Sequence, residues 1–262
     1  MSKWLEYASK FEEGTENPYF EVRTAYQAHA NVISTLNEKA GRMIFLLGEP
    51  GTGKTFLLNH LLKDTELSHE PVLFETPVSS PKSFLLRLIK HMKAEPLSEE
   101  VEALKEQAEA LYADKKVLIM LDEAQLINSE TLEFMRILSD SRKFWIVCAM
   151  HQKEGREILE RSHFKSRPFK LIELGRLSAD ESDMFINTQL IFSHDKTILD
   201  FHQKHAKKIY NLCQGNFRYL KKLIYTEFSL LHEAQELDMS KFSKPSKCLI
   251  NMAAIEIGLI NV

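Results

Sequence analysis

The stretch Gly48-Glu49-Pro50-Gly51-Thr52-Gly53-Lys54-Thr55 matches the phosphate-loop pattern G-x-x-x-x-G-K-[ST] at every fixed position. It follows the apolar run 43–47, which predicts a buried strand, and precedes residues 56–62, whose spacing predicts a helix. The glycines let backbone N–H groups approach phosphate oxygens, and a helix N-terminus adds partial positive charge. The stretch therefore predicts a nucleotide site whose contacts run from Gly48 to Phe56.

Individual side chains in and beyond the loop predict hydrolysis as well as binding. Lys54 can reach the outer phosphates, and the Thr55 hydroxyl can ligate Mg²⁺. The segment Asp122-Glu123-Ala124-Gln125 follows the apolar run 117–121. Asp122 can hold magnesium through water, and Glu123 can orient and deprotonate an attacking water. Asp-Glu after an apolar run is common, so the prediction depends on its pairing with the phosphate loop.

The order of elements predicts an α/β fold. Apolar runs at 43–47, 71–76, 117–121, 144–150 and 169–174 alternate with helical patterns, which favours a five-stranded parallel sheet with helices on both faces. After Gly175 only helices are predicted, at 178–190, 198–213, 217–232 and 245–257. We expect an N-terminal segment and entry helix at 1–41 packed on the core, a nucleotide-binding core at 42–175, and a helical lid domain at 176–262.

Composition excludes few function classes. The formal net charge of −3 provides no overall basic field, which argues against a protein whose main task is coating DNA. Three distant cysteines fit no metal-ligand spacing and favour a reducing compartment. Residues 1–16 lack an apolar core, and no run is long and apolar enough for a membrane span. We expect a cytoplasmic protein, or one that reaches the inner membrane through a partner.

The two halves, GEPGTGKT and LIMLDEAQ with an extra strand between them, resemble the AAA+ ATPases. The resemblance implies a polar sensor at the end of the fourth strand, where we favour His151 over Gln152. It also implies an arginine that completes a neighbouring subunit's site, for which Arg161 and Arg167 are better candidates than Arg156. Each of these residues equally fits an ordinary surface side chain without such a role.

Two further segments extend the resemblance. Gln214-Gly215-Asn216-Phe217-Arg218 resembles the G-N-x-R sensor 2 motif, in which asparagine caps a helix and Arg218 faces the phosphates. Asn17-Pro18-Tyr19-Phe20 has a counterpart in relatives where a Pro-Phe pair helps enclose adenine. Tyr19 and Phe20 therefore either stack on the base or pack the first helix onto the sheet, and the sequence leaves both readings open.

At the subfamily level the chain resembles the ExeA/GspA-type secretion ATPases, with MshM-type pilus and TniB-type transposition relatives. This implies a Mg²⁺-dependent ATPase that forms an ATP-dependent homo-oligomer and works with protein partners of a membrane-associated machine. ATP is favoured over GTP because the sequence lacks a guanine-reading Asn-Lys-x-Asp motif. The alternative is a DNA-associated ATPase of transposition or replication, supported by a locally basic region: Lys204, Lys207, Lys208, Arg218, Lys221 and Lys222.

Overall fold

The computed structural model describes residues 2–12, 22–38, 42–141, 143–160, 168–191 and 195–261. The chain divides into two compact units. The sheet unit comprises Gln27–Pro50 and Lys54–Leu174, and the helical unit comprises Met1–Tyr26, Gly51–Gly53 and Gly175–Val262.

The sheet unit contains the predicted five-stranded sheet, and every strand pair in it is parallel. The strand order is β2-β3-β4-β1-β5. The prediction of the sheet is therefore confirmed. The strands are β1 (Met43–Gly48), β2 (Glu70–Phe74), β3 (Val117–Leu121), β4 (Phe144–His151) and β5 (Lys170–Glu173).

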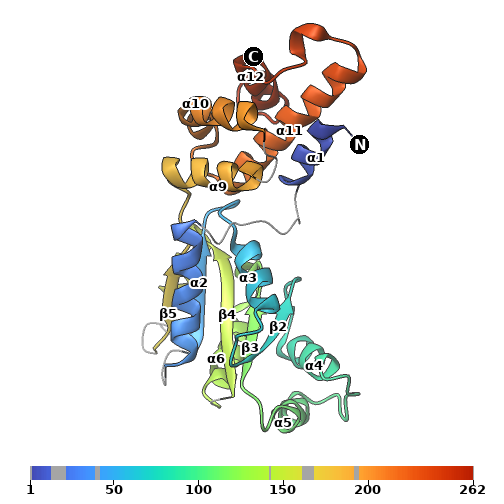
Figure 1. The fold of residues 1–262 in the computed structure, drawn as a ribbon. Coiled ribbons are helices and arrows are strands. Elements are labelled where there is room, and N and C mark those ends of the chain that lie inside the picture. The colour runs from blue at the N-terminus through green and yellow to red at the C-terminus, as the bar shows by residue number, and fades with distance from the viewer. Residues whose placement is uncertain are drawn as a thin grey trace. The chain divides into compact units, whose positions relative to one another are not determined.

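Burial explains why the central strands read as continuous apolar runs. Every residue of β1 and β3 is buried, because helices cover both faces of the sheet. Figure 1 shows α2 and α3 on the face of the sheet toward the viewer. The helices of this unit are α2 (Arg23–Leu36, which begins in the helical unit), α3 (Lys54–Lys63), α4 (Pro81–His91), α5 (Val101–Leu111), α6 (Ser129–Ser139) and α7 (Gln152–Leu159), with the 3-10 turn η2 (Ala124–Leu126).

The parallel pairing brings chemically important positions to one edge of the sheet. β1 lies beside β4, and Gly48 is in register with His151. β3 lies on the other side of β4, and Asp122 follows its last residue. The carboxyl ends of parallel strands share one edge, where ligands of such folds bind.

The helical unit consists of helices from both ends of the chain. Its first helix, α1, packs against α11 through aromatic side chains. The ring of Trp4 stacks on that of Phe228 with centroids 6.3 Å apart, and Phe11 contacts Phe185 edge to face at 6.1 Å. The helices are α1 (Lys3–Ser9), α9 (Ala179–Ile191), α10 (Lys196–Cys213), α11 (Phe217–Glu236) and α12 (Lys247–Glu256), with the 3-10 turn η3 (Ser240–Phe242).

This packing differs from the expectation for residues 1–41. We expected the whole N-terminal segment on the nucleotide-binding core, whereas α1 belongs to the helical unit and only Gln27 onward belongs to the sheet unit. The reason is the burial of the α1 aromatics on α11. The Lys221 ammonium strengthens the attachment by donating to the carbonyl of Glu12 at 2.6 Å. Lys221 is buried, so it does not contribute to the exposed basic region expected from the sequence.

Candidate nucleotide-binding and hydrolytic site

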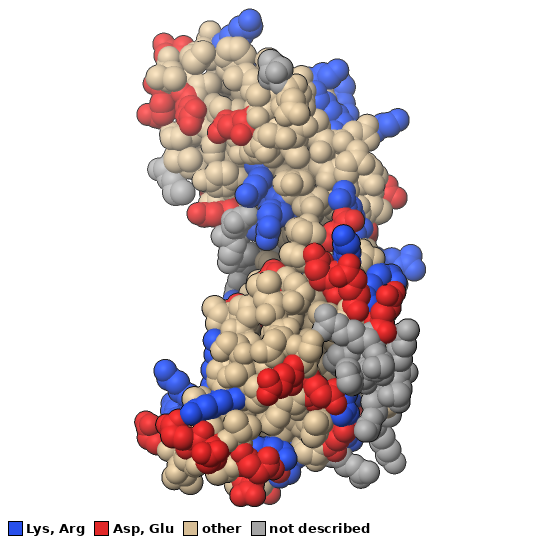
Figure 2. Space-filling model, turned by 180° about the vertical axis from the view of Figure 1, so that it is seen from behind, with Lys and Arg blue, Asp and Glu red and all other residues tan. Residues whose placement is uncertain are grey.

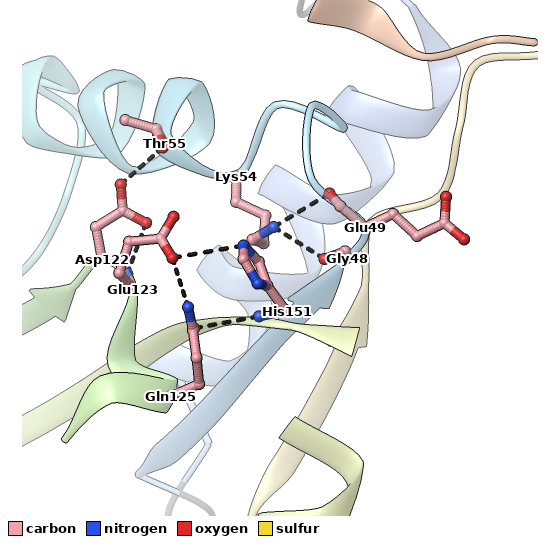
Figure 3. A network of polar contacts seen from close by, with 8 residues as sticks. All are labelled: Gly48, Glu49, Lys54, Thr55, Asp122, Glu123, Gln125 and His151. Atoms are coloured by element: carbon pink, nitrogen blue, oxygen red, sulfur yellow. Dashed lines mark hydrogen bonds and ion pairs between the residues drawn. The ribbon is translucent and has the colours of Figure 1, made fainter. Parts of the chain in front are cut away.

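The phosphate loop leaves the end of β1 and leads into α3. Gly51 and Gly53 have φ angles of 81° and 99°, in a region that side-chain-bearing residues rarely adopt. Lys54 opens α3 with a buried side chain, and its ammonium donates to the carbonyls of Gly48 at 2.8 Å and Glu49 at 3.2 Å (Figure 3). The loop thus holds a positive charge against its own backbone oxygens.

Thr55 and Asp122 form the second element of the site. The Thr55 hydroxyl donates to the Asp122 carboxylate at 2.6 Å, so α3 and the end of β3 meet at these two groups. The other carboxylate oxygen accepts the backbone N–H of Glu123 at 3.0 Å. The backbone N–H of Asp122 itself donates to the carbonyl of Phe74 at 3.2 Å, which fixes the residue at the sheet edge.

The donor set of this pair fits magnesium. A hydroxyl and a carboxylate are hard oxygen ligands, and Mg²⁺ is usually held by one or two such groups together with phosphates and water. Within the described ranges, no group of three or more His, Cys, Asp or Glu side chains gathers as a metal site.

Glu123 directly follows Asp122 and has an unusual backbone conformation. Its φ and ψ angles are 50° and 36°, in the left-handed region, where a residue with a side chain is strained. Its carboxylate accepts a hydrogen bond from the Gln125 amide and lies 3.4 Å from Nε2 of His151. The predicted catalytic base is therefore held by two neighbouring polar side chains.

His151 ends β4 and precedes the first turn of α7. Its ring contacts Glu123, and its backbone N–H donates to Oε1 of Gln125 at 3.3 Å. Of the two sensor candidates, the structure brings His151 into the network around Glu123 (Figure 3). Gln152 begins α7 and lines an adjacent cavity of about 400 Å³, together with Glu49, Pro50, His151, Lys153, Glu154 and Arg156.

Of the arginines considered for a neighbouring subunit's site, Arg156 lies within the described part of the chain. Arg156 lies on α7 and forms an ion pair with Glu173 of β5. Arg161 and Arg167 lie outside the described residues, and so do Tyr19 and Phe20, the candidates for enclosing adenine.

The G-N-x-R segment is part of the helical unit. Asn216 caps α11 by accepting the N–H of Tyr219 at 3.2 Å, so the predicted cap is confirmed. Gly215 has φ +69°, and a β-carbon there would lie 2.0 Å from the carbonyl oxygen of Leu177. Arg218 has an exposed side chain, and its backbone N–H donates at 3.1 Å to the carbonyl of Gly51, which belongs to the same unit. Its sensor role stays a prediction.

Gln125 belongs to the same network, although the sequence alone predicted no function for it. It lies two positions after Glu123 on η2, and its side chain contacts both Glu123 and His151. The only sequence signal was its place in the Asp-Glu-Ala-Gln segment, because contact with the end of β4 depends on the tertiary fold.

Comparison with known proteins identifies the fold. Residues 37–159 match the model of a family described as an AAA domain. No curated protein sequence matches the chain. Among solved structures, the ORC2 protein of Aeropyrum pernix in ADPNP-ADP complexes has a TM-score of 0.64 at 14% identity, covering 94% of this chain and 71% of that one.

Two other solved structures resemble the chain to a similar degree. Cdc6p of Pyrobaculum aerophilum gives a TM-score of 0.63 at 18% identity, covering 88% of this chain and 66% of that one. A Drosophila ORC structure bound to DNA gives 0.61 at 14% identity, covering 98% and 66%. These likenesses show the fold, and together with the domain match they confirm the expected P-loop AAA+ fold. The similarity covers 66% of the Pyrobaculum chain and 66% of the Drosophila chain, so both of those chains are longer than the region that resembles this one.

In the parts of the chain that the structure describes, none of the helices combines the length and the apolar character needed to cross a bilayer.

Proposed function

We propose that this protein is a magnesium-dependent ATPase that couples ATP binding and hydrolysis to conformational change. The observation that carries the proposal is the arrangement at one edge of the sheet. There, Lys54 lies on the phosphate loop, the Thr55 hydroxyl bonds to Asp122, and Glu123 contacts His151. The AAA-domain match over residues 37–159 supports the same chemistry.

Each group has a definite role in the proposed reaction. The Lys54 ammonium and the loop N–H groups bind the phosphates, and Thr55 and Asp122 would hold the metal. Mg²⁺ bound there would supply positive charge to the phosphate oxygens. Glu123 accepts a proton from the attacking water, whose oxygen forms the new bond to phosphorus. His151 lies within reach of the same carboxylate and orients the water.

Substitution of the proposed base tests the hydrolytic role. Glu123→Gln keeps the size of the side chain and one acceptor oxygen but removes its ability to accept a proton. We expect unchanged ATP affinity and a turnover number lower by about 100-fold or more, measured by phosphate release and by nucleotide titration. Glu130→Gln, at the exposed start of α6, is the matched control. Hydrolysis by Glu123→Gln at the parental rate excludes the role assigned to Glu123.

We further propose that an ATP-dependent homo-oligomer is the active form, with Arg161 or Arg167 reaching a neighbour's site and Arg218 sensing nucleotide from the G-N-x-R helix. The support is the AAA+ fold and the motif match. Mass measurement of the Glu123→Gln variant with and without ATP tests this proposal. A monomer under both conditions contradicts it.

For the target of the motor, we propose a protein assembly of the secretion, pilus or DNA-uptake type, on the basis of the sequence resemblance to the ExeA/GspA group. The alternative, a DNA-associated ATPase, is supported by the exposed Lys204 and Lys207 on α10. Figure 2 shows positive and negative side chains interspersed over the face drawn, which does not favour a continuous nucleic-acid track. DNA-stimulated ATPase activity with a strong salt dependence would favour the alternative.

A further inference from the structure

Glu123, Gln125 and His151 form a closed set of contacts at the carboxyl ends of β3 and β4. The Gln125 amide nitrogen donates to the Glu123 carboxylate, and its amide oxygen accepts the backbone N–H of His151 at 3.3 Å. The third side is the 3.4 Å contact between the His151 ring and the Glu123 carboxylate. One side chain thus joins the proposed base to the end of the neighbouring strand (Figure 3).

The chemistry of these partners fixes the orientation of the Gln125 amide. An ionised carboxylate only accepts hydrogen bonds and a backbone N–H only donates them. The amide nitrogen must therefore face Glu123, and the amide oxygen must face His151. A side chain that can only donate or only accept a hydrogen bond therefore cannot replace glutamine here.

The Gln125 side chain is not needed to close the turn on which it lies. The backbone does this itself, because the N–H of Leu126 donates to the carbonyl of Glu123 at 3.0 Å and that of Ile127 to the carbonyl of Ala124 at 3.1 Å. The left-handed backbone of Glu123 determines where its side chain begins, but the carboxylate position also depends on the side-chain torsions. Gln125 and His151 are the described side chains that contact that carboxylate.

We propose that Gln125 is a positioning residue for hydrolysis, which holds the Glu123 carboxylate at a fixed place relative to the end of β4. The inference rests on the proposed ATPase function. It assigns no contact between Gln125 and the nucleotide: Gln125 acts through Glu123. Loss of the amide lowers turnover because the base is no longer held where the attacking water must lie.

Two substitutions separate the two hydrogen bonds. Gln125→Met preserves the length of the side chain and removes both bonds. Gln125→Glu keeps an acceptor for the His151 N–H but places a carboxylate against that of Glu123. We expect both variants to lower kcat by about 10-fold or more while the dissociation constant for ATP changes less than about twofold. Leu126→Ala, at the adjacent and 69% exposed position, is the control and should retain parental kcat.

A double-mutant cycle tests whether Gln125 acts through Glu123. In the Glu123→Gln background, Gln125→Met should cause little further loss of turnover, because the group that it positions is already inactive. An equal loss in both backgrounds, or parental kcat in Gln125→Glu, overturns the inference. Thermal unfolding of every variant shows whether a lower kcat simply reflects a less stable fold.

Hydrogen exchange of the His151 amide gives a readout that does not require catalysis. We expect protection of this amide in the parent and in Gln125→Glu, and faster exchange in Gln125→Met. Unchanged exchange in Gln125→Met overturns the proposed tie to β4. A parent protein that binds ATP without hydrolysing it overturns the proposed function and the catalytic consequence together, while the exchange rates still decide whether Gln125 holds the end of β4.

Discussion

At the scale of single residues, Lys54 illustrates how the loop is prepared for an anion. Its buried ammonium is satisfied by the carbonyls of Gly48 and Glu49, so its charge is retained near the backbone N–H groups of the loop. A phosphate oxygen offers a charged partner in place of a neutral carbonyl, and hydrogen bonds between charged groups are the stronger ones.

Lys54→Ala should therefore raise the dissociation constant for ATP by about 100-fold, equivalent to about 3 kcal/mol of lost charged hydrogen bonding. Isothermal titration with ATP and with ADP measures the effect. Lys63→Ala, at the exposed last position of the same helix, is the matched control. Equal affinities of the two variants would contradict the role given to Lys54.

The sequence predicted single residues well where a local motif specifies them. The loop from Gly48 to Thr55 and the Asp122-Glu123 pair could be recognised because each lies next to its own apolar strand. Gln125 could not be assigned a role, since its partner His151 is 26 residues away and reaches it only through strand pairing. Lys221 was grouped with surface lysines because its partner, the carbonyl of Glu12, is 209 residues away.

At the scale of elements, the close packing of α7 against β1 depends on one small residue. Gly155 is buried, and a β-carbon added to it would lie 2.3 Å from Cδ2 of Leu47 on β1, a side chain that is itself fully buried. The helix can approach β1 this closely only because Gly155 has no side chain. This close packing also fixes the start of α7, where His151 contacts Glu123.

Gly155→Ala should destabilise the sheet unit by about 1–3 kcal/mol through overpacking and should lower kcat by displacing His151. Gly175→Ala is the matched control, because a β-carbon at Gly175 meets no atom within 4 Å. Thermal unfolding and steady-state ATPase assays of both variants provide the comparison. A Gly155→Ala protein with parental stability and kcat would show that α7 can shift without consequence.

Sequence patterns located most elements within a few residues. The second strand was expected at 71–76 and is found at Glu70–Phe74, and the helix expected at 198–213 is α10, Lys196–Cys213. Helix α1 was not predicted. Its apolar residues Trp4 and Tyr7 are stabilised by packing on α11, and Phe11, just after the helix, packs on α9. A seven-residue segment has too few turns for a clear helical pattern.

At the scale of the whole molecule, each unit has a buried histidine, and the pKa values of the two are shifted in opposite directions. In the sheet unit, burial and then the charge of Lys116 lower the pKa of His69 to about 4. In the helical unit, burial lowers the pKa of His202, but the carboxylate of Glu227 at 3.2 Å and other bonds outweigh it, so the pKa is raised. Protonation of these histidines should therefore destabilise the sheet unit and stabilise the helical unit.

The signs follow from comparing each folded pKa with the unfolded value near 6.5. Below about pH 6.5 the unfolded chain takes up a proton that His69 resists, so the sheet unit should lose stability as the pH falls from 6.5 toward 4. His202 binds its proton more tightly when folded. Its stabilisation of the helical unit is fully present below pH 6.5 and is lost as the pH rises through the folded pKa.

The two tryptophans allow each unit to be followed separately, because Trp4 lies in the helical unit and Trp145 in the sheet unit. Denaturant unfolding by fluorescence, with Trp4→Phe or Trp145→Phe leaving one reporter, should show opposite trends with pH. His69→Phe should remove the acid sensitivity of the sheet unit, and His202→Gln the alkaline sensitivity of the helical unit. Identical pH profiles for both reporters would contradict these assignments.

The attachment of α1 to α11 also bears on how the chain matures during translation. Helix α1 is synthesised before the sheet unit, and its aromatic partner Phe228 follows it by more than two hundred residues. All five strands of the sheet unit emerge in between. Trp4 and Tyr7 consequently lack their native neighbour Phe228 while the whole sheet unit is being synthesised, so these apolar side chains are exposed in the nascent chain and can associate non-specifically until α11 has formed.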